Sequence, residues 1–199
     1  MTITRLIMVA VGGQGNLMAS KVLGEAALIE GIPVRMSEIH GMAQRGGVVE
    51  SAIVFGDAQS TIISDGEADV LLGFEPSETL RAMNRCSRKT TVITNTAPLP
   101  PFTAAIGRGV YPAIDDIKRL IIERTGNLIA FDALALAKEA GNSMTLNIVL
   151  LGALVQTNAL SLSRDSVAQA IKRRTKKGFV DMNLKALDLG FQAAQDMKS

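Results

Sequence analysis

Residues 34–55 constrain the fold of this chain more than any other stretch. They form two segments rich in apolar and β-branched residues, joined by the short connection 41–47 with its three glycines. Such segments predict two strands. A connection this short joins antiparallel neighbours, because a parallel pair needs a crossover of about a dozen residues or more. The sheet is therefore predicted to be mixed, which argues against an ordinary dinucleotide-binding domain.

A second glycine cluster, Gly-Gly-Gln-Gly at residues 12–15, follows an apolar run at 3–11 and precedes a helix predicted over 16–30. A strand, a glycine turn and a helix together favour phosphate binding, because free N–H groups and the helix dipole point out of the helix start. The spacing matches neither Gly-x-Gly-x-x-Gly nor the P-loop. Two interpretations stay open: an anion-binding loop, or a tight turn without a ligand.

Further strands and helices alternate along the rest of the chain. Strands are predicted at 70–74, 91–95 and 128–131, and helices at 77–85 and 114–121, after Asp132, after Asn142 or Ser143, after Ser163, and at the C-terminus. Arg85, Arg88 and Lys89 are placed near the end of the helix at 77–85. The alternation predicts a three-layer α/β/α fold with a mixed, mostly parallel sheet, in a single domain over residues 1–199.

The amino-acid composition indicates how the sheet and one helix are buried. Apolar residues make up 47% of the 199 residues and aromatic residues only 4%. This aliphatic excess suits a sheet covered on both faces. The helix at 146–154 is apolar nearly all round, so it is internal or at an interface. If it is at an interface, the isolated chain should form a homodimer or aggregate.

Charge and cysteine content exclude several classes of site. The net charge is +2, so no global field favours nucleic acid. The single cysteine, Cys86, has no Cys-x-x-Cys partner for zinc or an iron–sulfur cluster. The apolar run near the N-terminus is too short for a signal peptide, and the stretch 148–155 is far shorter than the ~20 residues that span a bilayer. We expect no membrane association, no metal site and a cytoplasmic location.

Few residues are candidates for chemistry. His40, the only histidine, is a candidate general acid or base, or a hydrogen-bonded strand-end residue. Arg45 is a candidate anion clamp, or a solvated loop charge. Glu75 precedes Pro76 and is either catalytic or the acid at a helix start. The basic run 172–177 is most simply a helix end, and could also meet a phosphate or an acidic partner.

These residues match a known family. The chain resembles, over nearly its whole length, the gamma-type domain of 2-oxoacid:ferredoxin oxidoreductases. The form of the loop at 40–47, His-Gly-Met-Ala-Gln-Arg-Gly-Gly, resembles the indolepyruvate branch and its beta subunit in particular. Ala10 departs from the family, which often has glycine there. The motifs that carry the resemblance lie at residues 11–15, 40–47, 73–78, 95–98 and 147–153.

The resemblance implies a reaction and a division of labour. A 2-oxoacid is decarboxylated on thiamine diphosphate, electrons pass through iron–sulfur clusters to ferredoxin, and the acyl group goes to coenzyme A. This chain has neither a Gly-Asp-Gly thiamine signature nor cluster cysteines, so a larger partner subunit should carry those cofactors. The resemblance implies that this chain closes the active cleft and offers the main-chain N–H groups of its two glycine loops, with Arg45, to the carboxylate, diphosphate or coenzyme A. The implied catalytic residues are His40 and Arg45. The implied cofactor-binding residues are Gly12, Gly13, Gln14, Gly15, Gln44, Gly46 and Gly47.

Other hypotheses stay open beside an indolepyruvate or aryl pyruvate oxidoreductase subunit. The chain could be the gamma subunit of a pyruvate or 2-oxoglutarate ferredoxin oxidoreductase. It could also be a stand-alone nucleotide- or coenzyme-binding module, or an interaction scaffold whose loops only bind protein. A partner chain with thiamine and cluster motifs would favour the first two.

Overall fold

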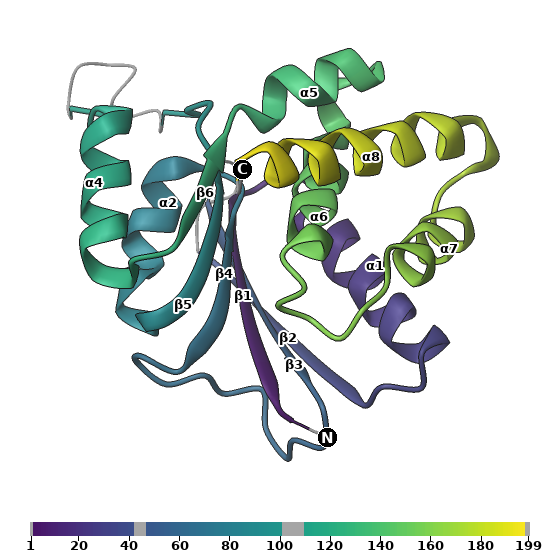
Figure 1. The fold of residues 1–199 in the computed structure, drawn as a ribbon, viewed down its shortest axis with the longest axis horizontal. Helices are drawn as coiled ribbons and strands as arrows, with labels where there is room; N and C mark the ends of the chain where they lie inside the picture. Colours follow the sequence, from purple (N-terminus) through teal and green to yellow (C-terminus); the bar gives the residue numbers. More distant parts are fainter. Residues whose placement is uncertain (1, 42–46, 101–109, 198–199) are drawn as a thin grey trace.

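The computed structural model describes residues 2–41, 47–100 and 110–197. A twisted six-stranded sheet runs through the molecule with helices on both sides (Figure 1), in the order β2-β3-β1-β4-β5-β6. The strands are β1 (Thr4–Val11), β2 (Val34–His40), β3 (Val48–Phe55), β4 (Ala68–Gly73), β5 (Cys86–Asn95) and β6 (Leu128–Phe131).

The strand pairing confirms a mixed sheet. β2 pairs with β3, and β3 with β1, in antiparallel register, so residues 34–55 form the predicted antiparallel pair. The pairs β1–β4, β4–β5 and β5–β6 are all parallel. The connection at 41–47 therefore joins antiparallel neighbours at one edge of the sheet, as its length requires.

Helices cover both faces, which confirms the three-layer fold (Figure 1). Among the described residues, five helices lie on one side of the sheet and two on the other. The first group is α1 (Asn16–Ile29), α5 (Ala133–Ala140), α6 (Leu146–Gln156), α7 (Arg164–Arg174) and α8 (Val180–Asp196), and the second is α2 (Pro76–Arg81) and α4 (Ile114–Thr125). Short 3₁₀ turns lie at Ala82–Arg85, Ser143–Thr145 and Lys177–Phe179.

Alternation along the strands creates two separate cores. In β1, Leu6 and Met8 belong to the core beneath α1 and α6, whereas Ile7 and Val9 belong to the core beneath α4. Successive side chains of a strand point to opposite faces, so a continuous apolar run fills both cores at once. This explains why residues 6–11 are apolar without interruption.

The apolar helix α6 is internal. Its residues from Leu146 to Val155 are all buried, and it lies between the sheet and α8 in Figure 1. Close approach to α8 depends on two glycines. A Cβ built on Gly152 would lie 2.0 Å from the carbonyl oxygen of Leu187, and one on Gly190 would lie 1.8 Å from that of Val149. The apolar character of α6 is therefore satisfied within the chain and gives no support to a homodimer.

Most predicted helix boundaries are confirmed by their caps. Asp132 accepts a hydrogen bond from the Ala135 N–H, and Ser163 accepts one from the Ser166 N–H. One boundary was wrong. Arg88 and Lys89 lie in β5, which begins at Cys86, because the helix has already ended in the 3₁₀ turn Ala82–Arg85.

The topology marks where a ligand would lie. The helix after β1 covers one face of the sheet and the helix after β4 covers the other, although β1 and β4 are neighbours. Ligands of such sheets bind at the carboxyl ends of the strands where the connections diverge in this way. Among the described residues, no helix combines the length and apolar character that crossing a bilayer requires.

Candidate functional site

The two predicted glycine loops meet at the carboxyl end of β1. The N–H of Gly12 donates to the carbonyl oxygen of Gly47 at 2.8 Å. Gly13 and Gly15 have φ angles of 99° and 83°, which side chains of L-residues rarely adopt. Gly15 precedes α1, and no side chain caps that helix start. The loop at 12–15 is thus a real left-handed turn that leaves the first N–H groups of α1 without a side-chain partner.

The two positive-φ glycines have different surroundings. A Cβ on Gly15 would lie 2.8 Å from Nδ2 of Asn147, which donates to the Gly15 carbonyl at 3.2 Å. A Cβ on Gly13 would meet nothing within 4 Å. Gly15 is therefore needed for packing against the start of α6, while Gly13 presents open backbone to the solvent side.

Gln14 forms hydrogen bonds at the carboxyl ends of β1 and β4, the neighbouring strands whose following helices cover opposite faces of the sheet. Its Oε1 accepts from the N–H of Val11 at 2.8 Å, and its Nε2 donates to the carbonyl of Phe74 at 3.2 Å. The side chain thereby joins the end of β1 to the segment after β4. Gln14 is one of the residues predicted to bind a cofactor, and in the structure both ends of its amide hydrogen-bond within the protein.

Asn95, at the end of β5, was not among the predicted site residues. Its Nδ2 donates to the carbonyls of Phe74 and Ala97 at 3.1 and 3.0 Å. Its Oδ1 accepts from the N–H groups of Ala97 and Ala133, both at 3.1 Å. Only 1% of its surface is exposed. The sequence signal that could have found this residue is an asparagine at the end of a buried strand. A buried amide needs several hydrogen-bond partners, so such a residue is expected to join neighbouring loops.

Glu75 caps α2 and joins both ends of the neighbouring loop. Its Oε2 accepts from the N–H of Glu78 at 2.9 Å, which confirms the helix-start interpretation. Its Oε1 accepts from the N–H of Leu99 at 3.2 Å and from the Tyr111 hydroxyl at 2.5 Å. Burial, and then donation to this carboxylate, raise the pKa of Tyr111. Burial also raises the pKa of Glu78. Glu75 is 1% exposed, so it holds the wall of the site and does not contact solvent.

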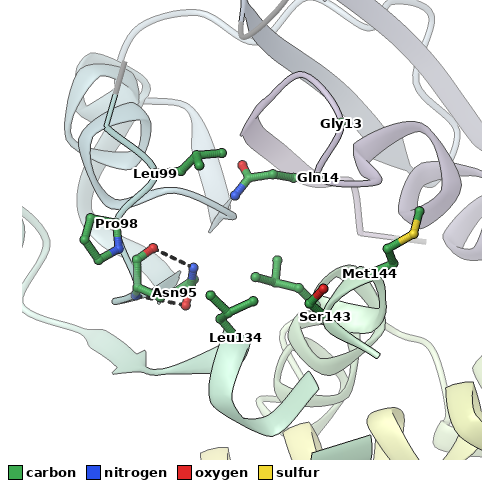
Figure 2. Close-up of a pocket in the computed structure, with 10 residues that line it drawn as sticks. Gly13, Gln14, Asn95, Pro98, Leu99, Leu134, Ser143 and Met144 are labelled. Atoms are coloured by element: carbon green, nitrogen blue, oxygen red, sulfur yellow. Dashed lines mark hydrogen bonds between the residues drawn. The ribbon is translucent and has the colours of Figure 1, made fainter. Parts of the chain in front are cut away.

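A pocket of about 220 Å³ opens between these elements. Figure 2 shows Gln14 and Leu99 on one side of it and Leu134 and Ser143 on the other. It lies at the carboxyl ends of β1 and β5, beside the open backbone of Gly13, where the topology places a ligand. The residues that line it are Gly13, Gln14, Asn95, Ala97, Pro98, Leu99, Leu134, Ser143, Met144 and Leu146.

His40 lies at the end of the edge strand β2 and does not line this pocket. Its Nε2 is 3.5 Å from Oε2 of Glu38, and 60% of its side chain is exposed. Oε1 of Glu38 accepts from the hydroxyls of Ser20 and Ser51 at 3.0 and 3.3 Å. Glu38 is thus fixed by two serines beside an exposed imidazole. This arrangement leaves both interpretations of His40 open.

The remaining predicted residues are placed only in part. Gln44, Arg45 and Gly46 lie outside the described residues. Arg173 and Arg174, in the basic run, pair with Glu25 on α1, at 3.0 and 2.6 Å.

The described residues offer little to a metal. No group of three His, Cys, Asp or Glu side chains among them is placed to hold an ion. Cys86 is buried, and burial raises the pKa of its thiol to about 11, which keeps the thiol protonated and unreactive.

Comparison with known proteins agrees with this geometry. The model of the pyruvate ferredoxin/flavodoxin oxidoreductase family matches residues 5–193. An indolepyruvate oxidoreductase subunit IorB from Pyrococcus horikoshii is 44% identical over 194 residues, covering 96% of each chain. The IorB subunit from Methanothermobacter thermautotrophicus is 42% identical over 186 residues, covering 94% of this chain and 95% of the relative.

Solved structures share the fold. The gamma subunit of a keto/oxoacid ferredoxin oxidoreductase from Geobacter sulfurreducens superposes with a TM-score of 0.72 at 24% identity, covering 97% of this chain and 99% of that one. A 2-oxoglutarate:ferredoxin oxidoreductase from Magnetococcus marinus gives 0.73 at 17% identity, covering 98% of this chain and 32% of that one. The chain therefore belongs to the pyruvate ferredoxin/flavodoxin oxidoreductase family and is a subunit of a 2-oxoacid ferredoxin oxidoreductase.

Proposed function

We propose that this chain is the subunit of an indolepyruvate ferredoxin oxidoreductase that completes the active cleft without carrying the redox cofactors. The observation behind the proposal is the contrast in identity. The IorB relatives reach 44%, whereas 2-oxoglutarate synthase subunits reach 26% over similar lengths. The substrates would be aryl 2-oxoacids, and the products would be the corresponding acyl-coenzyme A, carbon dioxide and reduced ferredoxin.

The residues of this chain do not fit thiamine diphosphate or an iron–sulfur cluster. The sequence has one cysteine and no Gly-Asp-Gly segment, and that cysteine is buried. We therefore assign both cofactors, and contact with ferredoxin, to a larger partner subunit. A single buried thiol also suits a reducing compartment, which supports a cytoplasmic location.

Coenzyme A or the substrate carboxylate would fit the glycine loop better. Gly13 presents open backbone beside the start of α1, where N–H groups and the dipole favour an anion. When bound, coenzyme A supplies the thiol that accepts the acyl group. The contribution of Gly12, Gly13 and Gly15 would be to shape this turn, and that of Gln14 to hold it to Phe74.

The first test is whether activity depends on a partner. We expect the purified chain to be inert with indolepyruvate, coenzyme A, thiamine diphosphate and a viologen dye, and to be active once its co-purified partner is added. The control is the partner alone, which should also be inactive. Turnover by this chain without a second polypeptide would refute the division of labour.

The second test concerns Arg45, whose proposed role rests on the sequence. A guanidinium provides paired donors that match a carboxylate or phosphate. If Arg45 binds substrate or coenzyme A, Arg45→Ala should lower kcat/KM of the assembled enzyme by an amount equivalent to about 2–5 kcal/mol, and Arg45→Lys should recover only part of it. Kinetics with each substrate varied in turn would identify its ligand. Unchanged kinetics for the alanine variant would remove Arg45 from the site.

A further inference from the structure

The amide groups that line the pocket beside Gly13 are already hydrogen-bonded within the protein. Both ends of the Gln14 amide and both ends of the Asn95 amide hydrogen-bond to the backbone of the protein. What remains of the wall is mainly carbon, contributed by Ala97, Pro98, Leu99, Leu134, Met144 and Leu146. A group that enters this pocket therefore gains by burying apolar surface and finds few hydrogen bonds.

None of the lining residues carries a charge. Among the residues that the structure describes, a second carboxylate, such as the one on 2-oxoglutarate, would find no cation in this lining, and losing its water there would be costly. The volume of about 220 Å³ is also more than the methyl group of pyruvate needs. It is smaller than the roughly 300–1,000 Å³ of pockets that enclose a whole drug-sized ligand. The pocket suits a bulky, uncharged part of a substrate.

The two ends of the pocket differ in a way that suits a substrate with an anionic head and an apolar tail. One end is the open backbone of Gly13, next to the uncapped start of α1. The other lies between Leu99 and Leu134, while Met144 lies on the side of the view opposite Leu99 (Figure 2). Thioethers make favourable contacts with the edges of aromatic rings. The head would lie toward the glycine loop and the tail among the leucines.

We propose that this pocket receives the aromatic side chain of the 2-oxoacid. Leu99, Leu134 and Leu146 then select aryl substrates over small or doubly charged ones. The inference rests on the proposed function, since it assigns a place to the substrate of that reaction. It adds that substrate choice resides in this subunit, although the redox cofactors reside in its partner.

The test compares two leucines of similar exposure in the assembled enzyme. Leu99 is 46% exposed and lines the pocket, whereas Leu120 is 41% exposed on the surface of α4. Asparagine in place of either keeps a branched side chain of similar shape, replaces its methyl groups with polar atoms and adds no charge. Leu99→Asn should lower kcat/KM for indolepyruvate about 10- to 100-fold while changing that for pyruvate less than about twofold. Leu120→Asn should change neither.

Each outcome of this comparison supports or overturns a stated part of the argument. Equal loss for both substrates in Leu99→Asn would overturn the proposal, as would no loss for either. Loss confined to indolepyruvate would support it. If the wild-type complex oxidises other 2-oxoacids but no aryl pyruvate, the proposed function itself has failed. If it oxidises aryl pyruvates and the variant keeps the wild-type preference, only the assignment of the pocket has failed.

A binding measurement covers the case in which a variant does not assemble. The chain has no tryptophan, so indole fluorescence can come only from an added probe. Indole-3-acetate should show a blue shift with the isolated full chain, because the pocket lies within this chain. Leu134→Asn should abolish the shift, and Leu120→Asn should retain it. No shift with the wild-type chain, or an equal shift with Leu134→Asn, would overturn the proposal.

Discussion

Two regions of the molecule are held together in different ways. One is the contact between α6 and α8, called the seam here, and the other is the set of loops at the carboxyl ends of the strands around the pocket, called the edge. At the seam, contact is fixed by shape: Gly152 and Gly190 let two helix backbones approach so closely that a Cβ has no room. At the edge, a few buried polar side chains, Gln14, Glu75 and Asn95, hold loops from separate strands by hydrogen bonds. Contact at the seam therefore leaves no room for a side chain, whereas contact at the edge depends on a few individual polar groups.

Glycine has a different meaning in the two regions. Gly190 has ordinary helical geometry and is needed because another backbone lies against it. Gly13 has a φ of 99° and faces open space, so only its conformation requires glycine. The first kind can be changed only at the expense of the fold, whereas the second can be changed to test function.

The largest expected effect is at the seam. Gly190→Ala would place a methyl group 1.8 Å from the carbonyl oxygen of Val149, and backbone atoms cannot rotate away as a side chain can. The gain in helix propensity, up to about 1 kcal/mol, is smaller than the clash. We expect the free energy of unfolding to fall by about 3 kcal/mol or more. Urea denaturation followed by circular dichroism measures this change.

Gly178→Ala is the matched control. A Cβ at Gly178 would meet nothing within 4 Å, and the residue lies in the 3₁₀ turn before α8. This variant should unfold at nearly the wild-type urea concentration. If Gly190→Ala is equally harmless, α6 and α8 must be able to move apart, and the seam is not fixed by shape.

Much of this architecture follows from local pattern. The apolar run at 3–11 becomes β1, residues 34–55 become an antiparallel pair, and Ser163 caps its helix, because period, turn length and capping act over a few residues. The start of β5 at Cys86 was missed, because the residues after the 3₁₀ turn are polar and charged. Pairing with β4, which shows a register shift there, determines that start.

The site was harder to predict than the fold. Sequence alone could locate the glycine loop at 12–15, but it could not show that Gln14 would donate to the carbonyl of Phe74, or that Gly15 would pack against Asn147. Those contacts join residues far apart in the chain, the second across 132 positions. The binding roles of His40 and the glycines stay predictions.

A smaller effect is expected at the edge. Tyr111→Phe removes the hydroxyl that donates to Glu75 and leaves the ring in place. A hydrogen bond to a charged group contributes about 1.5–3 kcal/mol when buried, and Tyr111 is only half-buried, so we expect a loss of about 1–2 kcal/mol. The raised pKa of Tyr111 means that its hydroxyl stabilises the fold below pH 10.0, its ordinary value, and that this contribution declines as the pH rises above it. Denaturation of both proteins at neutral and high pH would show the difference shrinking. A constant difference would mean that ring packing is responsible.

Gly13→Ala should affect stability about as much as Tyr111→Phe does, and activity more. The φ of 99° makes alanine unfavourable by about 1–2 kcal/mol, and no neighbouring atom adds a clash. If the loop binds an anion through its backbone, the altered turn should raise KM for coenzyme A or the 2-oxoacid in the assembled enzyme. Gly66→Ala is the control, since it has a φ of 77° in open space far along the chain. Two variants with equal stability loss and wild-type kinetics would show that the loop is a turn without a ligand.

The smallest effect is expected at the ion pairs between α1 and α7, which lie beside the apolar packing of these two helices. Hydrogen bonds from Arg173 and Arg174 lower the pKa of Glu25 below its ordinary value of 4.5. A lowered folded-state pKa means that the carboxylate stabilises the fold above pH 4.5, and that this contribution is lost as the pH falls through the lowered value. Glu25→Gln should therefore be slightly less stable than wild type at pH 7, and equally stable in strong acid. Glu123→Gln is the control, because its partner Arg119 lies in the same helix. Because exposed ion pairs are weak and screened by salt, added salt should reduce the difference at pH 7. A difference that persists in acid would mean that Glu25 acts through packing, and that the α1–α7 contact resembles the seam more than the edge.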